Sequence, residues 1–173
     1  DVAIDNQPVI AYRIPRSGRY RLVVELYDAD VASFCSVALL VRGHRPYDFG
    51  EIADATLGFL EAGVLAASHH GSAAFRERGW SLFGAVLSED ERVAVSGVDL
   101  LGREHRVVAI PASASRDDID LEVVDRRGIR VASDRRYDAG ATVLLDEPMR
   151  DAEIRVTQAA SRTSFAVFGI LDI

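Results

Sequence analysis

Lysine is absent from this chain of 173 residues, and all 20 residues of its Lys+Arg count are arginine. The absence excludes P-loop lysines, Schiff-base lysines and lysine general bases. Cys35 is the only cysteine, which excludes an internal disulfide and a thiolate metal cluster, and its apolar neighbours indicate a buried thiol. No apolar run approaches the roughly 18 residues of a membrane helix, so we expect no transmembrane segment; peripheral association with a membrane complex stays open.

The net charge of −7 argues against a nucleic-acid partner, because binding to phosphates needs a clustered basic surface. The 49% of hydrophobic residues is enough for a folded core and excludes disorder. The chain starts at Asp1, and Met149 is its one methionine. We therefore expect that a secretory leader, a tail or an anchor preceded Asp1.

Alternation of apolar and polar residues is the strongest pattern, and it is typical of half-buried strands. Residues 19–27 alternate clearly, residues 9–14 precede them across a Pro15 to Gly18 turn, and residues 34–41 form a more buried run. The second half repeats the pattern at residues 80–87, 92–98, 104–111, 119–125, 129–133, 142–146, 152–157 and 164–173. Short turn signals between these runs predict antiparallel connections.

Residues 50–79 fit two interpretations. Their apolar residues follow an approximate helical stripe, but Gly58 and Gly63 each cost a helix about 1 kcal/mol relative to alanine. Strands at residues 55–60 and 63–68 are the alternative. A short helical turn at 72–78 is also expected.

These patterns predict an all-β protein with little helix, built from two tandem antiparallel β-sandwiches of jelly-roll character. The acidic break at residues 88–91 is the predicted boundary, giving domains 1–87 and 88–173. A single large sandwich is the alternative, because each half is small for a core of its own.

The stretch from residue 84 to residue 173 resembles the pre-peptidase C-terminal domain, a bacterial secreted β-sandwich that accompanies exported proteases and other enzymes. Residues 118–134 look like that family's strand, turn and second strand, and 152–157 and 164–169 stand where its two closing strands lie. The resemblance implies binding, targeting or stabilisation outside the cytoplasm, periplasmic or secreted, and carries over no catalytic residue.

Two groups of side chains are candidate metal ligands. Closely spaced carboxylates suit calcium, which makes Asp117, Asp118 and Asp120 the main candidates and Asp28 and Asp30 further ones. Adjacent imidazoles can bind a transition metal, and the chain has such a pair. That pair is His69 and His70. In each case an exposed turn or loop is the simpler interpretation, so we expect no metal and no cofactor.

Paired arginines and loop aromatics are the candidate partner contacts. The arginine guanidinium forms bidentate hydrogen bonds with carboxylates, and exposed aromatic side chains are common anchors in protein interfaces. The candidates are Arg45, Tyr47, Phe49, Arg126, Arg127, Arg135 and Arg136. In a chain without lysine, however, arginine also fills every ordinary surface site for positive charge.

The sequence therefore predicts a non-catalytic protein that works through contact with other protein subunits. We expect either an accessory or peripheral subunit of a larger bacterial assembly, on the aqueous face of a membrane complex for instance, or an exported targeting module. The alternative is a calcium- or ligand-binding module of an exported hydrolase. A serine-histidine enzyme at Ser68 to Ser72 is rejected, because the segment lacks the strand-turn-helix context of a nucleophile elbow.

Overall fold

The computed structural model describes residues 12–18, 20, 23, 49–75, 80–102, 104–112, 117–160 and 162–173. The chain divides into two units, residues 1–38 and residues 39–173.

In the first unit, the described residues contain no helix or strand. The chain bends at residues 16–18, after Pro15, and the Tyr20 hydroxyl donates a hydrogen bond to the carbonyl oxygen of Arg16 at 2.6 Å. This bend agrees with the turn that the sequence predicts. Within the strands expected over residues 9–14, 19–27 and 34–41, the described residues 12–14, 20 and 23 are not in a strand, so the expectation is wrong there. The remaining residues of these segments, with Cys35, lie outside the described residues.

In the second unit, the described residues form one helix and nine strands. They are α1 (Phe49–His70), β1 (Ala74–Phe75), β2 (Leu82–Leu87), β3 (Arg92–Leu100), β4 (His105–Pro111), β5 (Ile119–Val124), β6 (Arg130–Asp134), β7 (Ala141–Leu145), β8 (Met149–Gln158) and β9 (Ser164–Asp172). No helix among these residues is both long enough and apolar enough to cross a membrane. The strands expected from β2 to β9 are confirmed, with ends that differ by a few residues.

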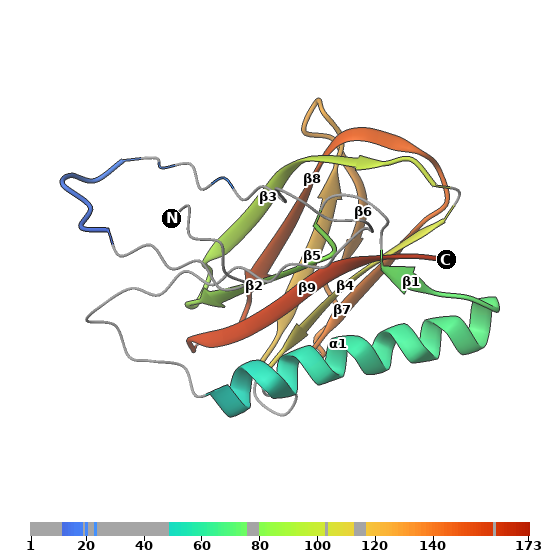
Figure 1. The fold of residues 1–173 in the computed structure, drawn as a ribbon, viewed down its shortest axis with the longest axis horizontal. Coiled ribbons are helices and arrows are strands. Elements are labelled where there is room, and N and C mark those ends of the chain that lie inside the picture. Colours follow the sequence, from blue (N-terminus) through green and yellow to red (C-terminus); the bar gives the residue numbers. More distant parts are fainter. Residues whose placement is uncertain are drawn as a thin grey trace, which may run out of the picture. The chain divides into compact units, whose positions relative to one another are not determined.

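The strands form two antiparallel sheets that pack as a sandwich (Figure 1). Sheet A has the order β1-β9-β4-β7, and β2 also pairs with β9, on the same side as β1. Sheet B has the order β3-β8-β5-β6. Figure 1 shows helix α1 along the outer side of sheet A, where its contacts are with β9 and β4.

The core lies between the sheets and follows directly from the alternation in the sequence. In β8, Ala152, Ile154 and Val156 are fully buried, while the residues between them are less buried. Strand β9 differs, because nearly all of its residues are buried. One face of β9 contacts the core and the other contacts α1, so a continuous apolar run is what this strand requires.

The expectation of two tandem sandwiches is corrected: the described residues form one sandwich. Strand β2 lies before the expected boundary, yet it pairs with β9 over residues 82–87. The acidic segment 88–91 is a tight turn between the two sheets, closed by a hydrogen bond from Glu91 N to Ser88 O of 2.9 Å. A boundary at this turn would separate neighbouring strands of one sheet.

Residues 49–70 are helical, so the helical interpretation of this region holds, and the expectation of an all-β fold is corrected to a mostly β fold with one helix among the described residues. The short helical turn expected at 72–78 is wrong at Ala74 and Phe75, which form β1. One glycine in α1, Gly58, has a packing role. A Cβ at Gly58 would lie 2.8 Å from Ile110 Cγ2, so the missing side chain allows the helix to lie close to the sheet.

Two substitutions in α1 test this role of glycine. At Gly63 a new Cβ would lie 3.6 Å from Leu171, an ordinary contact, so Gly63→Ala should raise the free energy of unfolding by about 1 kcal/mol through helix propensity. Gly58→Ala has the same gain in helix propensity, but Ile110 must shift to make room for the new Cβ. The net effect should be a decrease of about 1 kcal/mol in the free energy of unfolding. Urea denaturation measures both. An equal gain in the two variants would contradict the close-approach explanation.

Candidate functional site

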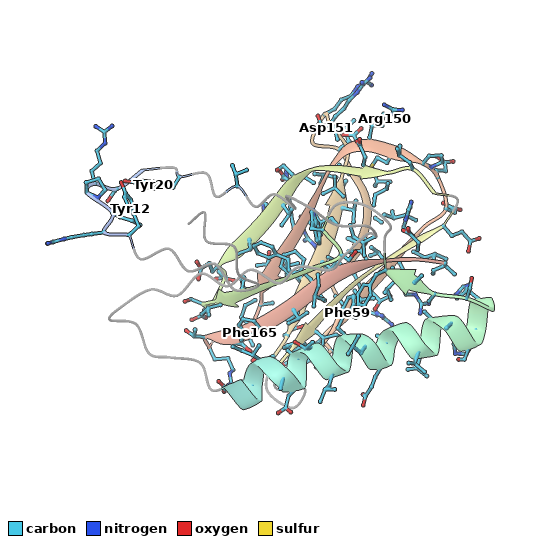
Figure 2. All side chains as sticks on the ribbon, in the orientation of Figure 1. Tyr12, Tyr20, Phe59, Arg150, Asp151 and Phe165 are labelled. Carbon is cyan, nitrogen blue, oxygen red and sulfur yellow. The ribbon has the colours of Figure 1, made fainter. Side chains whose placement is uncertain are left out.

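Helix α1 has a buried face and an apolar outer face. Ala55 and Phe59 are fully buried against sheet A, and Ala66 is also fully buried. In Figure 2 the labelled Phe59 points from the helix toward the sheet. On the outer side, Leu57 is 56% exposed and Val64 is 70% exposed. Exposed large apolar side chains gathered on one side of a helix are typical of a surface that contacts a partner, so the outer side of α1 is a candidate docking face.

The outer side of α1 contains four exposed large apolar residues and carries acidic charge alone. The apolar residues are Leu57, Leu60, Val64 and Leu65. Asp54 and Glu61 are exposed on the same side, and the helix contains no arginine; the basic groups near its end are His69 and His70. We call this surface, Leu57, Leu60, Val64 and Leu65 with Asp54 and Glu61, the α1 outer face.

The predicted calcium ligand Asp117 is engaged in a buried network. Its carboxylate accepts hydrogen bonds from Ser164 Oγ at 2.6 Å and from Gln158 Nε2 at 3.1 Å, and Arg162 Nε lies 3.2 Å away. Gln158 Oε1 in turn accepts a hydrogen bond from the backbone N–H of Asp118 at 3.2 Å. Asp117 therefore ties the start of β5 to β8 and β9 and has a structural role.

Asp118 and Asp120 lie close together, but they do not complete a metal site. Among the described residues, no group of three or more histidine, cysteine or acidic side chains could hold a metal ion. Asp118 Oδ1 is buried and has no hydrogen-bond partner within the described structure. Burial and the nearby carboxylate of Asp138 raise the pKa of Asp118. Burial and the charge of Asp118 raise the pKa of Asp120.

Two of the predicted partner-binding arginines bind carboxylates of their own chain. Arg135 and Arg130 both pair with Glu122; burial alone would raise the pKa of this carboxyl, but the two hydrogen bonds outweigh burial and lower it. Arg136 binds Asp134 through both of its carboxylate oxygens, at 2.9 and 2.7 Å. These contacts use the arginine forks to join β5, β6 and the segment after β6.

Of the remaining candidate residues, two arginines are exposed in a turn, and the side chains of the others lie outside the described residues. Arg126 and Arg127 are exposed in the turn between β5 and β6, where Arg127 N donates a hydrogen bond to Asp125. Phe49 is the first residue of α1, and its side chain lies outside the described residues. Arg45, Tyr47, Asp28 and Asp30 also lie outside the described residues.

The histidines occupy separate positions in the described part of the chain. His69 and His70 end α1, and His70 Nδ1 lies 4.0 Å from Glu104 Oε2. His105 is buried; its Nδ1 is 2.7 Å from Asp172 Oδ1, and its Nε2 accepts a hydrogen bond from Gly102 N at 2.9 Å. Both ring nitrogens of His105 are thus used within the fold, which ties the start of β4 to the end of β9.

Sequence reasoning missed the α1 outer face. The signal was present, because Leu57, Leu60 and Val64 have helical spacing, but so do the residues that face the sheet. A helix with apolar residues on every side gives no single stripe, and the sequence alone does not tell which side the sheet covers.

The two kinds of carboxylate predict opposite responses to pH. The pKa of Asp118 is raised, so ionisation of its carboxyl lowers the free energy of unfolding. The lost stability is recovered as the pH falls through the folded-state pKa and the carboxyl is protonated. Asp118→Asn should therefore raise the free energy of unfolding at pH 7 by up to about 1 kcal/mol, with no gain below pH of about 3.8.

Asp134 is the matched control, because its hydrogen bond from Arg136 lowers its pKa to about 2. Its contribution to stability is present above the unfolded pKa of about 3.8 and is lost as pH falls toward 2. Asp134→Asn should cost about 1 kcal/mol at pH 7, allowing for solvent around Arg136, and the cost should shrink in acid. Thermal melts across pH measure both variants; the same sign for both at pH 7 would contradict these assignments.

Comparison with known proteins finds no family model and no curated protein that matches this chain. The mitogen derived from Yersinia pseudotuberculosis is similar in structure over 52% of this chain and 82% of that chain, with 12% identity and a TM-score of 0.44. The pre-peptidase C-terminal domain of a Bacillus anthracis collagenase is similar in structure over 49% of this chain and 90% of that domain, with 3% identity and a TM-score of 0.36. PirA is similar in structure over 54% of this chain and 95% of the PirA chain, with 12% identity and a TM-score of 0.36. No family model supports the resemblance to a pre-peptidase C-terminal domain that residues 84–173 suggest.

Proposed function

We propose that this chain is a non-catalytic module that acts through protein-protein contact, as an accessory or peripheral subunit of a larger bacterial assembly outside the cytoplasm. The observation that carries the proposal is the apolar outer face of α1. It lies on a helix whose opposite side is held by sheet A, so the surface is presented by a well-packed scaffold.

The apolar side chains of this face are largely exposed to solvent, which is energetically unfavourable compared with burial. Leu57, Val64 and Leu65 are 56%, 70% and 59% exposed. Full burial of a leucine or valine side chain contributes about 1.5 to 3 kcal/mol relative to exposure. Several such side chains on one rigid helix provide a contact whose binding needs little ordering of the chain.

The charges on α1 favour a protein over a membrane as the partner. Amphipathic helices that lie on membranes carry lysine and arginine on their polar side, which anionic lipids attract. The α1 outer face instead has Asp54 and Glu61, and α1 contains no arginine. Anionic lipid would repel this surface.

Four buried titratable side chains of the sandwich support a non-catalytic role. Asp117, Glu122, Asp134 and His105 are all buried and all bind groups of their own chain. Side chains used in this way hold strands together, and a general acid or base would have to face a substrate.

The size of the native particle tests the proposal. In native extract the chain should elute well above its own 18.9 kDa, and Leu57→Asp with Val64→Asp should return it to that size, because two carboxylates cannot enter an apolar contact. Ile129→Asp is the control: Ile129 is 59% exposed in the β5–β6 turn, and its replacement should leave the large particle intact. Elution of the wild type as a lone 18.9 kDa species would contradict the proposal.

A further inference from the structure

The apolar residues on the outer side of α1 follow a heptad spacing. Ala53, Leu57, Leu60, Val64 and Ala67 are separated by four, three, four and three residues. This is the repeat of the core positions in a coiled coil, where each side chain inserts between side chains of a second helix. We call these five residues the α1 seam. Leu65 lies outside it, about 120° around the helix from its centre.

One flank of the α1 seam is acidic. Asp54 and Glu61 each follow a seam residue directly and are seven residues apart, so both occupy the same flanking row. The other flanking row holds Thr56 and Gly63, which are uncharged. In coiled coils these rows face charged residues of the partner helix and select which partner binds.

This charge pattern disfavours a second copy of the same helix. In an antiparallel pair, Asp54 and Glu61 would face the same two acids of the other copy, and like charges at this distance repel. In a parallel pair they would face Thr56 and Gly63, which offer no charge. The complementary surface is instead a helix with arginine or lysine along its flank.

We propose that the α1 seam binds an amphipathic helix of a partner protein, with apolar residues in heptad spacing and a basic flanking row opposite Asp54 and Glu61. The inference rests on the proposed function and names the chemistry of the partner. The helix pair buries Leu57, Leu60 and Val64, and the basic row neutralises the two acids.

Two synthetic helices of three heptads test the pairing. Both carry leucine at the seam positions; one has arginine in its flanking rows and the other has glutamate. Fluorescence anisotropy with the full chain should show that the arginine peptide binds about tenfold more tightly than the glutamate peptide, with the difference reduced by salt. Equal binding of both peptides, or binding of neither, would overturn the inference.

Substitutions in α1 sharpen the test. Leu60→Asp should abolish peptide binding, while the control outside α1, Ile129→Asp, which introduces the same charge at an exposed apolar residue of the β5–β6 turn, should leave it within about twofold. Asp54→Arg with Glu61→Arg should reverse the preference, so that the glutamate peptide binds more tightly. Circular dichroism melts show whether each variant is folded, and the reversal of preference cannot come from unfolding.

Other occupants of the α1 seam give different results, each of which overturns the inference. A wild-type dimer that Leu60→Asp dissociates would identify a second copy. Binding to vesicles of phosphatidylcholine and phosphatidylglycerol, lost in Leu60→Asp, would identify a lipid surface. Faster trypsin cleavage within residues 1–38 of Leu60→Asp would identify the chain's own first unit.

The two proposals fail in distinguishable ways. If the native particle depends on Leu57 and Val64 but neither peptide binds, the docking face stands and the basic helix is wrong. If the peptides bind as expected but the native chain elutes at 18.9 kDa, the pairing chemistry stands and the role in a larger assembly is wrong.

Discussion

Helix α1 and the lead-in to β2 can both reach β9 only because position 169 carries no side chain. A Cβ on Gly169 would lie 2.3 Å from Ser81 O and 2.7 Å from the Phe59 ring. The same stretch of β9 donates the Ile170 N–H to Ser81 O at 3.0 Å. This close approach holds the buried side of α1 against sheet A, and as a result the opposite side of the helix, with Leu57 and Val64, is turned outward.

The strands of the sandwich could be predicted from the sequence because each has a periodicity of its own. Strand β8 alternates cleanly, with Ile154 and Val156 buried. The sheets themselves could not be predicted, because alternation does not say which strands are neighbours. Strand β2 pairs with β9, more than 70 residues away in sequence, and this pairing joins two regions that the sequence suggested as separate domains.

The candidate site was harder to predict than the fold, because side chains of one chemical type serve different purposes. Asp117 and Asp118 are adjacent, yet one is surrounded by donors and the other has a buried oxygen without a partner. Arg135 and Arg136 bind Glu122 and Asp134, but their side chains stay 51% and 72% exposed, so their contact with a partner stays a prediction. A chain without lysine uses arginine for its internal ion pairs as well as for its surface, so the residue type alone does not separate these uses.

Strand β9 occupies the middle of sheet A although it is the last of the described strands in sequence. It pairs with β1, β2 and β4. Each of these strands therefore lacks its hydrogen-bonding partner β9 until residues 164–172 leave the ribosome. During synthesis, α1 also lacks much of the surface that later covers Phe59. Assembly of sheet A is therefore a long-range event, and the nascent chain must keep several apolar strands apart until β9 is made.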